Sequence, residues 1–492
     1  KRAEGNTVDV EVETDNHDKV RISSRAECGR AVFSPAGPAS GTEAELHDGD
    51  TLNVTKYSVL SCSRDPDGGA GFPSLHAQLD EAARHSDGLY RENAEEWAAL
   101  WENSAVVIEG DEKAQHALNF SIYHLLRAVN REDSRIAICA KGFAGEAYFG
   151  HFFWDTEIYL LPFFIYTDPE AAEKLVEFRI NTLPGAKENA RRYGYHGARY
   201  PWESSVSGLE QCPNWQYADN EVHVTADVTF GLWHYYHAAG DFEFLKKMAP
   251  VFTETAKYWL GRIEKKPDGE INLNGVMGPD EYICFCNNNA YTNYMVSSSL
   301  RNTLEILRIL REKDYGFYKS LDIGPERSEE IKYVSEHLPV RKRKDGPIYQ
   351  CDGFENFEEP RFDEFWKDRS KPYGTFVSQE RNYRTKALKQ ADVLMLPYLF
   401  PGRFSPEEIR LNYDYYIPYT THDSSLSAII HSIICCRTGN ADHALTFFHR
   451  ALSIDMDERK GGAGEGIHIA NCGGIWQAIV FGFAGMSRCY ES

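Results

Sequence analysis

The run Gly278-Pro279-Asp280-Glu281-Tyr282 places two carboxyl groups on a turn beside an aromatic ring. Glycine followed by proline interrupts regular structure, so the two acids are expected on a connection rather than inside a helix. An apolar neighbour can keep a carboxyl group protonated near neutral pH, which suits a proton donor. The alternative is a helix cap, because the acids and the following Asn287-Asn288-Asn289 are also typical N-terminal capping residues.

Three further runs combine aromatic, acidic and amide side chains in a way that suits a neutral, hydroxyl-rich ligand. They are Trp154-Asp155, Trp202-Glu203 and Lys389-Gln390, each expected at the start of a helix. A tryptophan ring can cover one face of a sugar while acids and amides bind its hydroxyl groups. The alternatives are a capping aspartate beside a core tryptophan, and an exposed helix face for the lysine run. His223, in a similar run, is expected to be structural.

Two runs suit an anion. Thr420-Thr421-His422-Asp423-Ser424-Ser425-Leu426-Ser427 offers hydroxyl groups at an expected helix start, where free N–H groups and the helix dipole favour negative charge. A plain serine cap is the alternative. The second run, Gly461 to His468, is a glycine-rich loop that lacks the Lys-Ser/Thr pair of a nucleotide-binding loop.

Composition narrows the class of protein. The 492 residues carry a formal net charge of -21, which argues against nucleic acid as a partner. No apolar stretch approaches the ~20 residues of a membrane span, so no membrane association is expected. The 11 cysteines lack zinc-ribbon spacing, and reduced thiols in a cytoplasmic protein are the simplest interpretation. We expect no metal and no cofactor.

The first part of the chain has the alternation of β-strands. Thr7–Val12, Val20–Ser23 and Leu52–Leu60 predict strands, and residues 1–65 are interpreted as the end of a β-domain. A helical linker is expected over residues 66–110, with one helix from about Ser74 to Asn103 and a short strand at Val106–Glu109.

From Asp111 to the end, the periodicity is helical. After a first helix near Asp111, helices are predicted at about Trp154–Tyr166, Pro169–Asn181, Val222–Ala239, Asp241–Ile263, Tyr291–Arg311, Pro325–His337, Thr385–Leu399, Pro406–Tyr416, Ser424–Thr438, Ala441–Leu452 and Ile475–Met486. Helices paired by short turns must bury their apolar faces on one another. The pattern therefore predicts a mainly α protein with an (α/α) barrel over residues 111–492. A solenoid of helical pairs is the alternative.

Six of these runs, in order, resemble the maltose, kojibiose and trehalose phosphorylases of glycoside hydrolase family 65. The matching runs are His151–Glu157, Tyr200–Glu203, His223–Asp227, Gly278–Tyr282, Lys389–Val393 and Thr420–Ser427. The resemblance covers residues 90 to 487 and implies an (α/α)6 barrel preceded by a β-sandwich and followed by a smaller β-domain. It implies that this chain holds only the end of the sandwich, that the C-terminal β-domain is absent, and that the full-length protein is a homodimer.

The resemblance also implies a reaction: phosphate attacks an α-linked glucoside with inversion, giving β-D-glucose 1-phosphate and a free acceptor. Glu281 is then the general acid. Trp154, Asp155, Trp202, Glu203, Lys389 and Gln390 bind the glucose, and Ser424, Ser425 and His468 bind phosphate with help from the Gly462–Gly466 backbone. The partners are thus a small α-glucoside and inorganic phosphate, the latter a co-substrate.

The same runs are also compatible with three other functions. An inverting hydrolase needs a base for water, and Glu465 is the only acid in the glycine-rich loop. A sugar-binding protein without activity, or a helical scaffold without a ligand, needs neither a catalytic acid nor a base. Ile283-Cys284-Phe285-Cys286-Asn287 is less polar than we associate with the maltose and trehalose enzymes, which leaves kojibiose, nigerose or a glucosylglycerol more open as substrates.

Overall fold

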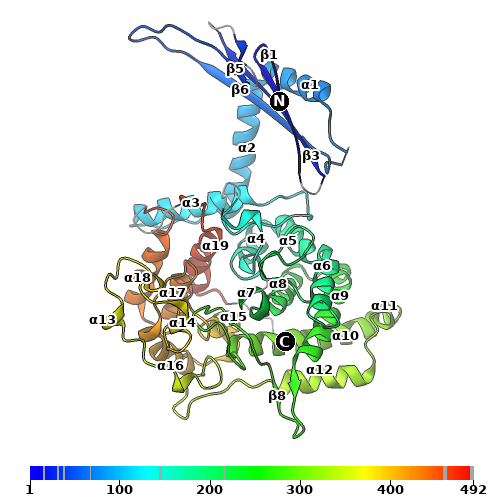
Figure 1. The fold of residues 1–492 in the computed structure, drawn as a ribbon, viewed down its shortest axis with the longest axis vertical. Coiled ribbons are helices and arrows are strands. Elements are labelled where there is room, and N and C mark those ends of the chain that lie inside the picture. Colours follow the sequence, from blue (N-terminus) through cyan, green and yellow to red (C-terminus); the bar gives the residue numbers. More distant parts are fainter. Residues whose placement is uncertain are drawn as a thin grey trace. The chain divides into compact units, whose positions relative to one another are not determined.

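The computed structural model describes residues 1–14, 17–29, 33–36, 39–66, 68–142, 147–213, 216–457 and 463–487. The chain forms two compact units, Lys1–Glu102 and Asn103–Ser492 (Figure 1). Among the described residues, no helix is both long and apolar enough to cross a membrane.

The N-terminal unit is built on an antiparallel sheet with the strand order β1-β2-β3-β6. Its strands are β1 (Arg2–Glu4), β2 (Thr7–Glu13), β3 (Lys19–Cys28) and β6 (Val54–Cys62), and the short β4 (Ser34–Ala36) and β5 (Ala39–Gly41) form a separate ribbon. The predicted strands Thr7–Val12 and Val20–Ser23 are confirmed as parts of β2 and β3. The predicted strand Leu52–Leu60 overlaps β6, which begins two residues later.

One face of this sheet is covered by α1 (Phe72–Arg84). Leu75 and Leu79 of α1 are fully buried, and Ser23 of β3 donates to Asp9 of β2 over 2.6 Å. Side chains alternate along a strand, so the opposite face carries Leu60, which is 65% exposed. The single linker helix expected from Ser74 is wrong: α1 ends before His85 and α2 (Ser86–Ser104) follows. Residues 106–109 form no strand.

The second unit is an (α/α)6 barrel. Within the described residues, six helical segments pack side by side in a closed ring. They are η2 (Thr156–Leu160) continued by α4 (Leu161–Thr167), α8 (Val224–Ala239), α10 (Ala290–Lys313), α15 (Met395–Leu399), α17 (Ser427–Arg437) and α19 (Ile469–Gln477). Because α19 packs against η2 and α4, the ring closes and the solenoid is excluded.

A second layer of helices surrounds this ring (Figure 1). It consists of α3 (Glu112–Ala128), α5 (Pro169–Asn181), α9 (Phe242–Arg262), α12 (Pro325–His337), α16 (Pro406–Tyr416) and α18 (Ala441–Leu452). Every residue from Val224 to Tyr235 of α8 is buried, as expected for a helix enclosed on all sides. The outer helix α18 instead buries one face. The prediction that the helices pair and bury their apolar faces on one another is confirmed.

Smaller elements fill the connections. They are η1 (Ala147–Gly150), α6 (Leu183–Arg192), α7 (Gln216–Asn220), β7 (Glu264–Lys265), β8 (Ile271–Asn272), α11 (Tyr315–Ser320), η3 (Phe354–Asn356), α13 (Phe362–Phe365), η4 (Tyr373–Thr375), α14 (Gln379–Asn382), η5 (Pro401–Arg403) and η6 (Ile417–Tyr419). The last element, η8 (Ala478–Phe483), continues directly from α19.

The predicted helix Thr385–Leu399 is wrong over most of its length, because only α15 is helical. Upstream, Leu388 pairs in parallel with Thr420, and the Lys389 N–H donates to the Asp280 carboxylate over 2.7 Å. These long-range partners take backbone groups that a helix would have used internally.

Close approach of the inner helices depends on a glycine of α19. A Cβ at Gly473 would lie 2.1 Å from the carbonyl oxygen of Tyr159 in η2. We expect Gly473→Ala to lower the free energy of unfolding by about 1–3 kcal/mol, because the added methyl group overpacks a backbone contact. Thermal unfolding measures the loss. Gly464→Ala is the control, since its Cβ meets nothing within 4 Å, and equal melting temperatures for the two variants would contradict the prediction.

Candidate active site

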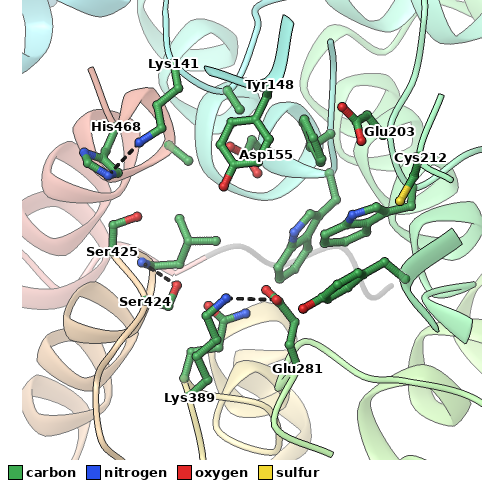
Figure 2. A pocket seen from close by; sticks show the side chains of 18 of the residues that line it. Lys141, Tyr148, Asp155, Glu203, Cys212, Glu281, Lys389, Ser424, Ser425 and His468 are labelled. Carbon is green, nitrogen blue, oxygen red and sulfur yellow. Dashed lines mark hydrogen bonds and ion pairs between the residues drawn. The ribbon is translucent and has the colours of Figure 1, made fainter. Parts of the chain in front are cut away.

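A cavity of about 510 Å³ opens where the inner helices begin (Figure 2). This volume lies within the usual range for small-ligand pockets. All ten residues predicted to form the site line it: Glu281, Trp154, Asp155, Trp202, Glu203, Lys389, Gln390, Ser424, Ser425 and His468. The barrel therefore brings together side chains from runs that are far apart in the sequence.

The position of these runs follows from the ring. Asp155 directly precedes η2, and His468 directly precedes α19. Glu281, Lys389 and Ser424 lie on the connections that lead into α10, α15 and α17. Because these five residues lie on the segments that lead into the N-terminal ends of inner helices, ring closure makes them face one space.

Glu281 points into the cavity and meets a lysine from another connection (Figure 2). The Lys389 ammonium donates to a carboxylate oxygen of Glu281 over 2.9 Å. Burial lowers the pKa of Lys389, but the attraction of Glu281 outweighs it, so this pKa lies above its usual value. Glu281 is not the cap of α10. That cap is Asn289, whose side chain accepts from the Thr292 N–H over 2.8 Å.

Two buried aspartates hold the Glu281 turn in place. Asp280 accepts from the Lys389 N–H over 2.7 Å and from the Gln350 amide over 3.0 Å. Asp392 accepts from the Asn289 amide over 3.1 Å. Burial raises the pKa of each aspartate to about 7. The turn also needs its glycine, because a Cβ at Gly278 would lie 2.3 Å from an Asp392 oxygen.

These raised pKa values make stability depend on pH. Between their ordinary pKa of 3.8 and about 7, Asp280 and Asp392 hold protons in the folded protein and release them in the unfolded chain. Unfolding therefore releases protons, and stability falls as pH rises through this window. We expect Asp392→Asn to reduce this fall, measured as the change in melting temperature from pH 5 to pH 8. An unchanged slope would contradict the assignment. Exposed Asp345→Asn is the control.

The two Trp-acid runs meet through a backbone bridge. Phe152 and Ser204 exchange N–H···O bonds of 3.0 and 2.8 Å, which brings Trp202-Glu203 beside Trp154-Asp155. The Trp202 run is a bend rather than the predicted helix start. Asp155 does not cap η2 through its side chain, and burial together with Glu157 raises its pKa to about 7. Glu203 pairs with His151 over 2.8 Å.

His223 does not line the cavity but supports its aromatic wall. Its ring lies edge-on to Trp154 and Trp202, with centroids 5.0 and 6.1 Å away. Its Nδ1 lies 2.6 Å from an Asp227 oxygen, and its side chain is fully buried. The structural role expected for this histidine agrees with these contacts.

Ser424, Ser425 and His468 share one wall with Lys141, which the sequence analysis missed (Figure 2). His468 Nε2 lies 2.9 Å from the Lys141 ammonium, and His468 Nδ1 lies 2.7 Å from Asp455. With Asp455 accepting at Nδ1, a neutral His468 turns its Nε2 lone pair toward Lys141. Burial lowers the pKa of Lys141. The Ser424 hydroxyl accepts from the Leu426 N–H over 3.2 Å.

Other lining residues also escaped prediction. They include Tyr148, Cys212, Tyr217 and Asp423. Of these residues, only Asp423 lies in one of the runs identified from the sequence, the hydroxyl-rich run. The neighbours of the other three in the sequence give no signal of a binding site. Glu465 is exposed and does not line the cavity. Of the glycine-rich loop, residues 461–462 lie outside the described residues. Ile283–Asn287 do not line the cavity either, and Phe285 lines a separate hollow.

Comparison with known proteins finds a family model that matches residues 119–477, described as the glycosyl hydrolase family 65 central catalytic domain. The kojibiose phosphorylase of Caldanaerobacter subterraneus subsp. tengcongensis is 38% identical over 475 residues, covering 92% of this chain and 62% of that protein. The nigerose phosphorylase of Lachnoclostridium phytofermentans is 33% identical, covering 89% of this chain and 61% of that protein.

A solved structure described as a candidate kojibiose phosphorylase from the human microbiome superimposes with a TM-score of 0.88 at 29% identity. The match covers 98% of this chain and 65% of that chain. This chain thus spans about three fifths of the length of the curated relatives it matches.

Proposed function

Because the chain belongs to glycoside hydrolase family 65, we propose that it is an inverting α-glucoside phosphorylase, a glycosyltransferase that uses inorganic phosphate. Phosphate attacks the anomeric carbon of an α-linked glucoside, the bond to the acceptor oxygen breaks, and β-D-glucose 1-phosphate forms. The observation that carries this proposal is one cavity lined by both Glu281 and the wall of Lys141, Ser424, Ser425 and His468.

Glu281 is the proposed general acid. Its proton passes to the acceptor oxygen as the glycosidic bond breaks, and general acids of this kind act from a fixed position beside the leaving atom. The ammonium of Lys389 and the interlocked turn around Asp280 fix the carboxyl group at the edge of the cavity. The acid then needs no partner base, because phosphate is already an anionic nucleophile.

Phosphate is proposed to bind at Ser424, Ser425, His468 and Lys141. Two hydroxyl groups and an ammonium can donate to phosphate oxygens, and the His468 imidazole can do so when its Nε2 is protonated. The N-terminus of α19 adds a favourable dipole. A phosphate site requires a cation, and Lys141 supplies one here. Lys141 does not belong to any of the runs identified from the sequence. Once phosphate is present, the Lys141 ammonium can donate to it instead of to His468.

The glucose is proposed to lie between the two tryptophans and the Lys389-Gln390 segment, with Asp155 and Glu203 accepting from its hydroxyl groups. The Gln390 amide donates to the carbonyl oxygen of Pro279, whereas its Oε1 is buried and has no hydrogen-bond partner among the described residues. A buried acceptor in a cavity wall costs free energy until a donor arrives. A small movement of the Gln390 side chain toward the cavity would let a sugar hydroxyl satisfy it.

We extend the proposal to compartment and assembly. The described cysteines are all free thiols, which suits a reducing, cytoplasmic setting. We propose that the reaction uses glucoside and phosphate alone. Separately, no group of three or more His, Cys, Asp or Glu among the described residues could hold a metal ion. A homodimer of the full-length protein remains part of the proposal.

The test incubates the full-length protein with kojibiose, nigerose, maltose, trehalose and a glucosylglycerol, with and without phosphate. Formation of β-glucose 1-phosphate only with phosphate supports the proposal, and the best substrate identifies the acceptor. Free glucose formed at the same rate without phosphate would refute it in favour of a hydrolase, with Glu465 as the base to examine.

Lys141→Met tests the phosphate wall. We expect the KM for phosphate to rise by about 10-fold to 100-fold, the loss expected for one charge-assisted hydrogen bond. Initial rates at varied phosphate concentration measure it. Lys386→Met is the matched control, because Lys386 pairs with Glu359 over 2.6 Å and does not line the cavity. An unchanged KM for phosphate would remove Lys141 from the site.

A further inference from the structure

The carboxylate of Asp423 joins two segments that come from different parts of the chain. Its Oδ2 accepts from the phenol of Tyr282, 141 residues away, and from the Gly374 N–H over 3.0 Å. Asp423 also lines the cavity, directly before Ser424. Tyr282 directly follows Glu281. The hydrogen bond from Tyr282 to Asp423 therefore connects the residue that follows the proposed acid with the residue that precedes the proposed phosphate-binding serines.

The backbone reinforces this junction. The Asp423 N–H donates to the carbonyl oxygen of Lys389 over 3.1 Å, and Thr421 N–H donates to that of Leu388 over 2.8 Å. Lys389 in turn reaches Glu281 through its ammonium. Hydrogen bonds thus connect the segments leading into α10, α15 and α17 beside the cavity. The Tyr282–Asp423 bond joins side chains of the segments that lead into α10 and α17.

Asp423 also anchors the segment that carries Gly374. Phe362, Trp366 and Tyr373 pack with Tyr282 in one apolar cluster, in which the Tyr373 ring lies 6.4 Å from that of Tyr282. A Cβ at Gly374 would lie 2.8 Å from the Tyr282 oxygen. This close approach leaves the Gly374 N–H and the Tyr282 hydroxyl side by side on one carboxylate oxygen.

The carboxylate is an unusual neighbour for a phosphate site, since like charges repel. Burial and Asp423 together raise the pKa of Tyr282, so its hydroxyl keeps the proton that it donates. The two donors hold Oδ2, and the Arg450 guanidinium lies close enough to interact with Asp423 and donates to the His422 carbonyl oxygen over 2.9 Å. The carboxylate oxygen Oδ2 of Asp423 is therefore bound by Tyr282 and Gly374.

Inverting phosphorolysis requires the proton donor and the nucleophile to be aligned at the same moment on opposite sides of one carbon. A displacement of about 1 Å at such a site can cost about 100-fold in rate. We propose that Asp423 is a positioning residue that sets the phosphate-binding turn in register with the Glu281 turn through Tyr282. This inference rests on the proposed phosphorylase function and adds a role that acts through Tyr282 rather than on the substrate.

The test compares Tyr282→Phe, Asp423→Ala and Asp423→Asn in the full-length protein. Tyr282→Phe and Asp423→Ala should lower kcat for phosphorolysis by about 10-fold to 100-fold, with a smaller change in the KM for the glucoside. Asp423→Asn keeps an oxygen that accepts from Tyr282, so it should retain more activity than Asp423→Ala. The double variant Tyr282→Phe/Asp423→Ala should be no slower than the slower single variant, because both remove the same bond.

Tyr373→Phe is the matched control. Tyr373 belongs to the same cluster, but its hydroxyl donates to the carbonyl oxygen of Pro360 over 3.2 Å and not to Asp423. It should keep the wild-type kcat. Melting temperatures show which variants are folded. Should Tyr282→Phe be unfolded, the comparison of Asp423→Asn with Asp423→Ala decides the question by itself.

Different outcomes identify which idea fails. A wild-type protein that forms no glucose 1-phosphate from any glucoside overturns both the proposed function and this role. A wild-type protein with phosphorolysis, beside a folded Tyr282→Phe variant of equal kcat, overturns the positioning role alone. So do single effects that multiply in the double variant, or equal losses in Asp423→Asn and Asp423→Ala.

Discussion

Glu281→Gln should lower kcat for phosphorolysis by about 100-fold to 10,000-fold, the contribution typical of a positioned general acid. The amide has nearly the shape of the carboxyl group but has no proton to transfer to the acceptor oxygen. Initial rates with the best glucoside measure the loss. Binding should persist, because the tryptophans and the Lys389-Gln390 segment stay in place, and quenching of tryptophan fluorescence by glucoside can report it.

Two comparisons make this result specific. α-Glucosyl fluoride, whose leaving group needs little protonation, should be turned over by both wild type and Glu281→Gln at more similar rates. Glu465→Gln should behave as wild type, since Glu465 is exposed and outside the cavity. A Glu281→Gln variant with normal kcat on the natural glucoside, or a Glu465→Gln variant without activity, would contradict the assignment of the acid.

Arg179→Met should lower the free energy of unfolding by about 3–5 kcal/mol, because it leaves a buried carboxylate without its counter-charge. The Arg179 guanidinium donates to both oxygens of Glu157 over 2.6 and 3.0 Å, and both side chains are at most 3% exposed. It also donates to the carbonyl oxygen of Phe153 over 2.9 Å, next to Trp154. Chemical denaturation, followed by far-UV circular dichroism, measures the loss.

The pairing partner provides the control. In Glu157→Gln/Arg179→Met no unpaired charge remains, so the double variant should recover part of the stability lost in Arg179→Met. Arg191→Met removes an exposed partner of Glu188 and should change stability little. An Arg179→Met variant as stable as Arg191→Met would show that the buried pair does not hold η2.

Prediction from sequence succeeded where the signal is local. Asn289 caps α10 because its side chain reaches the Thr292 N–H three residues on. The bounds of α12, α16 and α18 agree with the prediction because capping residues and periodicity act within one or two turns. The same reasoning failed for Thr385–Leu399, where the Lys389 N–H is bound by Asp280, 109 residues away.

By itself, the sequence determined the chemical types in the site: acids beside tryptophans, a hydroxyl-rich run before α17 and an acid on a Gly-Pro turn. These depend on neighbouring residues and so can be read locally. The resemblance predicted that these runs share one site, but only the tertiary structure decided that Lys141 meets His468 across 327 residues and that Tyr282 binds Asp423. The physical reason is ring closure: contacts between connections exist only after six inner helices have buried their faces on one another, and no short stretch of sequence encodes that condition.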